Sequence, residues 1–182
     1  MGVLNVTPDS FSDGGQLISR GAILYDRLLE RASQMVADGA AILDIGGEST
    51  RPGAAPVSPQ EELDRVMGAV QLILPRLDVI LSIDTSTPEV MREAAQAGAG
   101  LLNDVRAFSR KGAMAAAVGS HLPISLMHMS DEPNRMQEQT DYADVVIDVK
   151  AFLEHRVAVC REAGVAKDQI MIDPGFGFGK TV

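Results

Sequence analysis

The sequence predicts an α/β fold with a parallel sheet, of the type found in a (β/α)₈ barrel. Six short apolar segments with strand character alternate strictly with five segments whose apolar residues recur at helical spacing. Nearly every strand-like segment also ends close to a polar residue, most often Asp or Asn. Because strands of a barrel converge at one mouth, this pattern favours a barrel over a doubly wound sheet, which gathers its ligand at one switch point.

The predicted elements follow one another without linkers or low-complexity tracts. The expected strands span residues 1–6, 41–45, 79–83, 101–102, 123–127 and 170–172, and the expected helices span residues 22–37, 58–74, 87–97, 112–118 and 141–163. A closed barrel needs eight strands. We therefore expect residues 1–182 to form one incomplete barrel domain that lacks strands seven and eight.

Two of the expected helices carry specific signals. At the start of one, Ser58 can act as the N-cap, Pro59 suits the first helical position and Glu61 completes a capping box. The last and longest helix has an apolar stripe, which we expect to face the core: Val145, Val146, Val149, Leu153, Val157 and Cys160.

Composition and charge exclude several classes of protein. The chain is 46% hydrophobic and 23% charged, which is ordinary for a globular domain. A net charge of −9 argues against nucleic-acid binding. The single cysteine, Cys160, allows no intrachain disulfide and no thiolate metal site, so we expect it to be a buried helix residue. No apolar run approaches the roughly 20 residues that span a bilayer, so we expect a cytoplasmic enzyme without a membrane partner.

The most distinctive stretch is the last one, residues 170–180. An apolar run ends at Asp173, Pro174 stops the strand, and three alternating glycines follow with phenylalanines between them. The glycines suggest a phosphate-binding loop, but the spacing fails. The Walker pattern requires glycine where Pro174 stands, and the dinucleotide pattern requires it where Lys180 stands.

Three polar residues end separate strands and form a more specific set: Asp84, Asn103 and Asp173. Two carboxylates and an amide suit a flat heterocycle with a guanidine-like edge, because a carboxylate accepts two parallel N–H bonds from such an edge. The alternative for each residue is that it merely caps a loop or the following helix.

Other polar residues suggest an anion and a cation. Thr50 and Arg51 lie on a glycine-flanked loop that suits a carboxylate or a phosphate, although Arg51 could also be solvated. Asn5 and Asp13 could bind a hard ion such as Mg²⁺ through oxygen. His128 follows a strand and could line the site. The other histidines, at 121 and 155, are expected on the surface, and no Ser-His-Asp arrangement stands out.

Five motifs, in this order, resemble dihydropteroate synthase over the whole chain. They are Leu4-Asn-Val-Thr-Pro-Asp-Ser-Phe-Ser-Asp-Gly-Gly15, Gly46-Gly-Glu-Ser-Thr-Arg-Pro-Gly53, Ser82-Ile-Asp-Thr-Ser86, Leu102-Asn-Asp104 and Asp173-Pro-Gly-Phe-Gly-Phe-Gly-Lys180. The resemblance implies a (β/α)₈ enzyme of folate synthesis and a target of sulfonamides. It would join p-aminobenzoate to 6-hydroxymethyl-7,8-dihydropterin pyrophosphate with Mg²⁺ and release pyrophosphate. It also implies a homodimer for the full-length form.

The resemblance assigns roles to individual residues. Asp84, Asn103 and Asp173 would bind the pterin, and Met127 would pack on its face. Asn5 would hold Mg²⁺ beside the pyrophosphate, which Thr50 and Arg51 would contact. The p-aminobenzoate pocket would be shaped by Phe11, Pro52 and Phe178, and Asp13 would help to close the first loop. Asp84, Arg51 and Asp13 are thus the expected catalytic residues.

The chain also departs from this family. The Ser-Arg-Lys and Arg-x-His motifs of strands seven and eight are absent, so we expect the 182-residue chain to be inactive alone. One alternative is a pterin-binding methyltransferase that acts on methyltetrahydrofolate with a corrinoid partner, but residues 7–15 and 49–53 resemble synthase loops. Another alternative is a non-catalytic fragment or binding module.

Overall fold

Six parallel strands form the main sheet. The computed structural model describes residues 1–7, 18–19, 22–23, 25–49, 57–130 and 142–180. Within these residues the sheet has the order β1-β4-β5-β6-β7-β8, and every pairing is parallel. The strands are β1 (Gly2–Asn5), β4 (Ile42–Gly46), β5 (Ile80–Asp84), β6 (Leu101–Asp104), β7 (Ile124–Met127) and β8 (Ile170–Asp173). The six predicted strands are confirmed.

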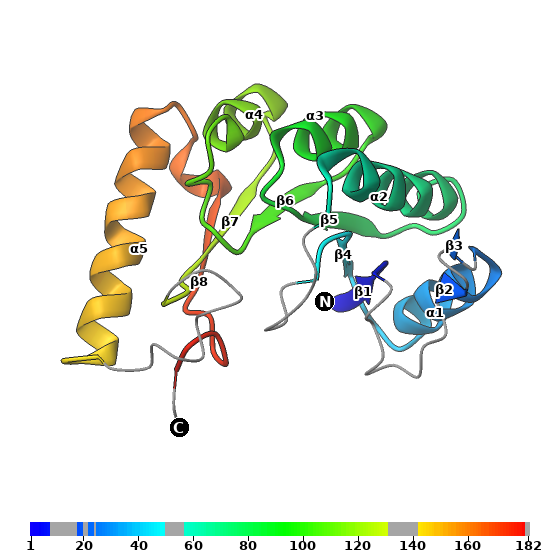
Figure 1. Cartoon of the computed structure of the whole chain (residues 1–182), viewed down its shortest axis with the longest axis horizontal. Coiled ribbons are helices and arrows are strands. Elements are labelled where there is room, and N and C mark those ends of the chain that lie inside the picture. The colour runs from blue at the N-terminus through cyan, green and yellow to red at the C-terminus, as the bar shows by residue number, and fades with distance from the viewer. Residues whose placement is uncertain (8–17, 20–21, 24, 50–56, 131–141, 181–182) are drawn as a thin grey trace.

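One α-helix follows each of the first five sheet strands. The helices are α1 (Tyr25–Ala37), α2 (Pro59–Ile73), α3 (Pro88–Ala97), α4 (Ala113–Ser120) and α5 (Val145–Glu162), with a 3₁₀ turn, η3 (Lys167–Gln169), before β8. Figure 1 shows these helices along the outer side of the curved sheet. In a doubly wound sheet the strand order reverses and helices cover both faces. The unbroken strand order therefore confirms the winding of the first six units of a (β/α)₈ barrel.

Several expected bounds differ from the structure, and three of the differences have a clear physical or structural basis. Ala22 and Ile23 do not begin a helix, because they form β3 (Ala22–Ile23), which pairs antiparallel with β2 (Ile18–Ser19). Helix α5 begins at Val145 because the Asp144 side chain accepts hydrogen bonds from two backbone N–H groups of the first turn, a typical N-cap. β6 continues to Asp104, past the expected end at residue 102.

The core lies between the sheet and the helices. Alternate strand residues are fully buried against α2 and α3, among them Leu43, Ile45, Leu81 and Ile83. Because strand side chains alternate, the residues between them face the other side of the sheet. Cys160 is buried on α5, as predicted. No helix among the described residues is long and apolar enough to cross a membrane.

The predicted apolar stripe of α5 is wrong at its N-terminal end. Val149, Leu153 and Cys160 are buried, but Val146 is 71% exposed and Val145 is also exposed. These valines lie beside an open groove of about 580 Å³ between α5 and the β8 edge. β8 pairs only with β7 in the described part of the sheet, so the outer side of this edge is uncovered.

Candidate active site at the carboxyl ends of the strands

The sheet register brings three of the predicted site residues into one row. Asn5 pairs with Gly46, Gly46 with Asp84, and Asp84 with Asn103. Residues directly opposite each other in a sheet point to the same face. Asn5, Asp84 and Asn103 therefore lie side by side on the inner face, and all three are half-buried.

The next two strands extend this face. Ser125 is the partner of Asn103, and Met127 lies two residues further along β7, so it points to the same side. Met127 in turn pairs with Asp173 at the end of β8. Met127 is 5% exposed, whereas Asp173 is exposed. An apolar side chain and five polar ones thus share one face towards the carboxyl ends of the strands.

Gly46 leaves a gap in the middle of the row. A Cβ at this position would lie 3.2 Å from Asn5 Oδ1 and 3.6 Å from Asp84 Oδ2. The absence of a side chain keeps these two oxygens accessible to the same space. A ligand atom can approach the backbone of β4 there, which is a common use of glycine in a binding site.

Two buried acids of the site, Asp84 and Asp44, resist ionisation. Burial raises the pKa of Asp84 well above its usual value, and the nearby charges of Asp44 and Asp104 raise it further, as do Glu62 and Glu48. Burial also raises the pKa of Asp44, although the hydrogen bond from Asn103 opposes this shift. A carboxyl group in such surroundings is poised to lose its proton when a cationic or N–H-rich ligand arrives.

A buried framework holds the loop that follows Asp84. Glu62 on α2 accepts hydrogen bonds from the hydroxyls of Thr85 and Thr87, and it is only 2% exposed. The Ser86 hydroxyl donates to Asp104 at the end of β6. This loop is therefore tied to both α2 and β6, which fixes the direction of Asp84.

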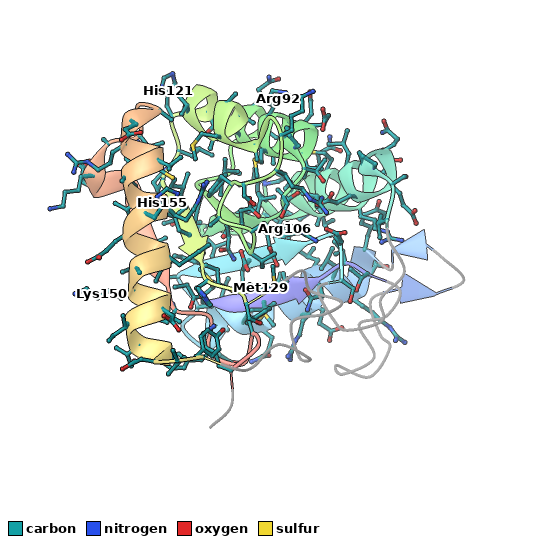
Figure 2. All side chains as sticks on the ribbon, turned by 60° about the vertical axis from the view of Figure 1, so that its left-hand side comes forward. Arg92, Arg106, His121, Met129, Lys150 and His155 are labelled. Carbon is teal, nitrogen blue, oxygen red and sulfur yellow. The ribbon has the colours of Figure 1, made fainter. Side chains whose placement is uncertain are left out.

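Asp104 and Arg106 organise the next loop. Asp104 accepts hydrogen bonds from the backbone N–H groups of Arg106 (2.9 Å) and Phe108 (2.7 Å). Arg106 lies deep between the strands and helices in Figure 2, donates to Ser86 Oγ, and lies 3.6 Å from Glu48. The contacts of Arg106 with Ser86 and Glu48 join distant segments, so no local pattern in the sequence assigns Arg106 a role.

The glycine-rich loop after β8 is folded around a lysine. The Lys180 ammonium donates to the carbonyl oxygens of Gly175 (2.9 Å), Phe178 (3.1 Å) and His128 (3.3 Å). Gly175 has a φ of +68°, and a Cβ there would lie 2.0 Å from the His128 carbonyl oxygen. Lys180 therefore holds its own loop together, which agrees with the rejection of a phosphate-binding loop. Phe178 is half-buried on this loop.

His128 does not match the suggestion that it lines the site. It is 6% exposed and packs edge-on against Phe152, with the ring centroids 4.9 Å apart. Burial lowers its pKa, and the Lys180 charge lowers it further. The other two histidines are exposed, as predicted. In the described part of the chain, no three His, Cys, Asp or Glu side chains converge to hold a metal.

The remaining predicted site residues lie outside the described residues. These are Phe11 and Asp13 in the first loop and Thr50, Arg51 and Pro52 in the second. Their flanking residues are described: Thr7 follows β1, and Glu48 and Ser49 follow β4. Both loops therefore leave the sheet at its carboxyl end, beside the row of Asn5 and Asp84.

A family model described as "Pterin binding enzyme" matches residues 1–182. The chain belongs to the pterin-binding enzyme family. It is 50% identical over its full length to dihydropteroate synthase of Escherichia coli K12 and 48% identical to that of Haemophilus influenzae. It covers 63% and 64% of these relatives, so it spans less than two thirds of their length.

Solved structures of pterin-binding enzymes share the fold. The Yersinia pestis dihydropteroate synthase with a sulfonamide drug complex is 50% identical, with a TM-score of 0.93 over the whole chain and 64% of that structure. The Burkholderia cenocepacia dihydropteroate synthase complexed with 7,8-dihydropteroate is 48% identical, with a TM-score of 0.82 over the whole chain and 59% of that structure. The resemblance found in the sequence motifs is thus confirmed.

Proposed function

We propose that residues 1–182 form the pterin-binding part of a dihydropteroate synthase, as one incomplete barrel domain. The reaction joins p-aminobenzoate to 6-hydroxymethyl-7,8-dihydropterin pyrophosphate and gives 7,8-dihydropteroate and pyrophosphate. The observation that carries this proposal is the row of Asn5, Asp84 and Asn103 beside Asp173, in a chain half identical to such enzymes. Relatives solved with 4-aminobenzoic acid and with 7,8-dihydropteroate support it.

The pterin is bound by the inner face of the sheet. Asp84, Asn103 and Asp173 offer two carboxylates and one amide to the N–H groups of the ring edge. A carboxylate can accept two parallel N–H bonds there. Met127 packs against the ring face. Because only the ionised carboxylate accepts both N–H bonds, the pterin binds best when Asp84, whose pKa the free site raises, releases its proton.

Magnesium fits the oxygen donors at one end of the row. Asn5 has an amide oxygen that faces the gap above Gly46, and Mg²⁺ prefers such hard oxygen ligands together with water and substrate phosphates. Asn5 would hold the ion next to the pyrophosphate, and the bound ion would supply positive charge against the leaving group. Thr50 and Arg51 would bind the same pyrophosphate from the second loop.

The reaction is dissociative. The bond between the pterin methylene carbon and the pyrophosphate oxygen breaks first, and the electron pair leaves with the pyrophosphate. The ionised Asp84 carboxylate then stabilises the positive charge on the pterin. The amine of p-aminobenzoate attacks the methylene carbon and loses a proton. Phe11, Pro52 and Phe178 shape the pocket of this second substrate, and Asp13 helps to close the first loop over it.

The proposal also includes the cellular location, the oligomeric state and the inhibitors of the enzyme. We place it in the cytoplasm, with the complete gene product as a homodimer, and we expect sulfonamides to compete with p-aminobenzoate. The matched relatives are synthases at 44% to 50% identity, which favours this activity over a methyltransferase that uses a corrinoid partner.

The Asp173→Asn variant tests the pterin site. An amide cannot accept two N–H bonds as a carboxylate does, so we expect pterin pyrophosphate to bind about tenfold more weakly. The affinity for p-aminobenzoate should change much less. Titration calorimetry of the complete gene product measures both affinities. An unchanged affinity for pterin pyrophosphate would remove Asp173 from the site.

A further inference from the structure

Asp44 is a buried acid that the proposed mechanism does not use. It lies on the inner face of β4, two residues before Gly46, and is 5% exposed. Its partner in the register is Ser82 on β5, so it lies one layer below Asp84 and Asn103. Its Oδ2 accepts a hydrogen bond of 3.1 Å from Nδ2 of Asn103.

This bond fixes the orientation of an amide. Asn has a donor end and an acceptor end. Because the bond runs from Nδ2 to Asp44 Oδ2, the NH₂ group of Asn103 is the end that faces Asp44. The amide oxygen Oδ1 is then directed away from Asp44 and is available to a hydrogen-bond donor.

We propose that Asp44 is a positioning residue, which makes Asn103 present its amide oxygen to the bound heterocycle. Asp44 thereby selects a ligand edge that carries an N–H group at that point and disfavours one that carries a bare ring nitrogen. The choice of the pterin as ligand rests on the proposed function, but the orientation of the amide does not.

The surroundings of Asp44 support this role. Within the described residues, Asp44 Oδ1 and Ser82 Oγ are buried and have no hydrogen-bond partner of good geometry. Among the described residues, the hydrogen bond from Asn103 is therefore the side-chain hydrogen bond of good geometry that Asp44 accepts. Placing a carboxylate in this layer carries an electrostatic cost, since it lies close enough to raise the pKa of Asp84. An amide at position 44 would avoid that cost but would leave Asn103 free to turn.

The test compares Asp44→Asn with a matched control, Glu62→Gln. Both changes replace a buried carboxylate near Asp84 by the amide of the same size, but Glu62 contacts Thr85 and Thr87 and not Asn103. The complete gene product is labelled with ¹⁵N, and the side-chain NH₂ signals of Asn103 are assigned by their loss in Asn103→Asp. Affinities for pterin pyrophosphate and p-aminobenzoate are measured on the same samples, with thermal unfolding as the check that each variant folds.

We expect Asp44→Asn to move the Asn103 NH₂ signals and to weaken pterin pyrophosphate binding about tenfold, with little effect on p-aminobenzoate. Glu62→Gln should leave the Asn103 signals in place. Unmoved Asn103 signals in Asp44→Asn overturn the inference, and so do moved signals with an unchanged pterin affinity. If Asp44→Asn does not fold, Asp44→Ser is used instead, because it keeps a polar side chain. The same results then support or overturn the inference. A wild type that binds no pterin pyrophosphate would overturn the proposed function, while moved signals would still support the orienting bond.

Discussion

At the scale of single residues, Asp84 combines a functional position with an energetic cost. Burial and four neighbouring acids raise its pKa, so at a pH between the usual and the raised value the folded protein holds a proton there that the unfolded chain has released. For such a carboxyl, the free energy of unfolding falls as the pH rises from the usual pKa of 3.8 towards the raised value. This cost is tolerated where a ligand later uses the charge.

The Asp84→Asn variant should therefore be more stable and less functional. An amide needs no deprotonation, so the variant avoids the loss of stability at higher pH. We expect the free energy of unfolding to exceed that of the wild type by about 1 kcal/mol at neutral pH, and we expect this difference to vanish near pH 4. Pterin binding should be severely weakened. Urea unfolding at several pH values measures the difference between the two proteins. A difference that does not change with pH would show that Asp84 has an ordinary pKa.

The gap above Gly46 permits a second test at this scale. In Gly46→Ala, the new methyl group would lie 3.2 Å from Asn5 Oδ1 and would fill the space shared with Asp84. We expect magnesium-dependent binding of pterin pyrophosphate to weaken about tenfold or more, with a small change in thermal stability. Gly119→Ala on α4 is the matched control, because a Cβ there has no neighbour within 4 Å. Equal affinities of the two variants would contradict a ligand in this gap.

The residues that sequence reasoning found are those with a local signature. Asp84, Asn103 and Asp173 each end an apolar run, and a parallel sheet brings such ends together without further information. Asp44 also ends such a run, but its role depends on a contact with Asn103, 59 positions away. Glu62 also lacks a local signature of its role, because the helix dipole alone explains an acid in the first turn of a helix.

At the scale of the elements, hydrophobic periodicity predicted the six strands of the main sheet and the five α-helices that the structure describes. It missed the β2–β3 hairpin, because two-residue strands are too short to show a period. At the start of α2, Ser58 accepts the N–H of Glu61 as predicted, but the Glu61 carboxylate pairs with Arg65. Capping signals thus place a helix end more reliably than they specify side-chain partners.

The loop after β8 is an element whose shape depends on one cation. Replacing Lys180 by Met removes three hydrogen bonds to the carbonyls of Gly175, Phe178 and His128. We expect faster hydrogen exchange at the Phe178 amide, which donates to Gly175 within the loop, and a KM for p-aminobenzoate that rises more than the KM for the pterin. Lys150→Met on α5 is the control, since Lys150 is exposed and pairs only loosely with Glu154. Unchanged exchange at Phe178 would show that the glycines alone shape the loop.

At the scale of the whole molecule, the six-stranded sheet has two edges, β1 and β8, in the described residues. A closed barrel has none, and open edges are sites of association between chains. Large apolar side chains lie beside the β8 edge: Val146 is 71% exposed, Ile172 59% and Phe176 86%. Full burial of each of these side chains would add about 1.5–3 kcal/mol to the free energy of unfolding. These three side chains line the same groove, so they form a contiguous apolar patch and are not isolated exposed residues.

The 182-residue chain expressed alone should therefore be weakly stable, prone to self-association and without synthase activity. The groove of about 580 Å³ beside α5 and β8 should bind the dye ANS and promote contact between copies. Replacing Val146 and Phe176 by Ser removes apolar surface that is mostly exposed in this chain. We expect that double variant to bind less dye and to elute closer to the monomer position, without a lower midpoint of thermal unfolding.

The matched control replaces the buried Leu153 by Ser, which leaves a polar group in the core and should unfold the chain. A cooperative monomeric transition with measurable release of pyrophosphate from residues 1–182 would contradict this expectation and would mean that six strands suffice for both folding and catalysis.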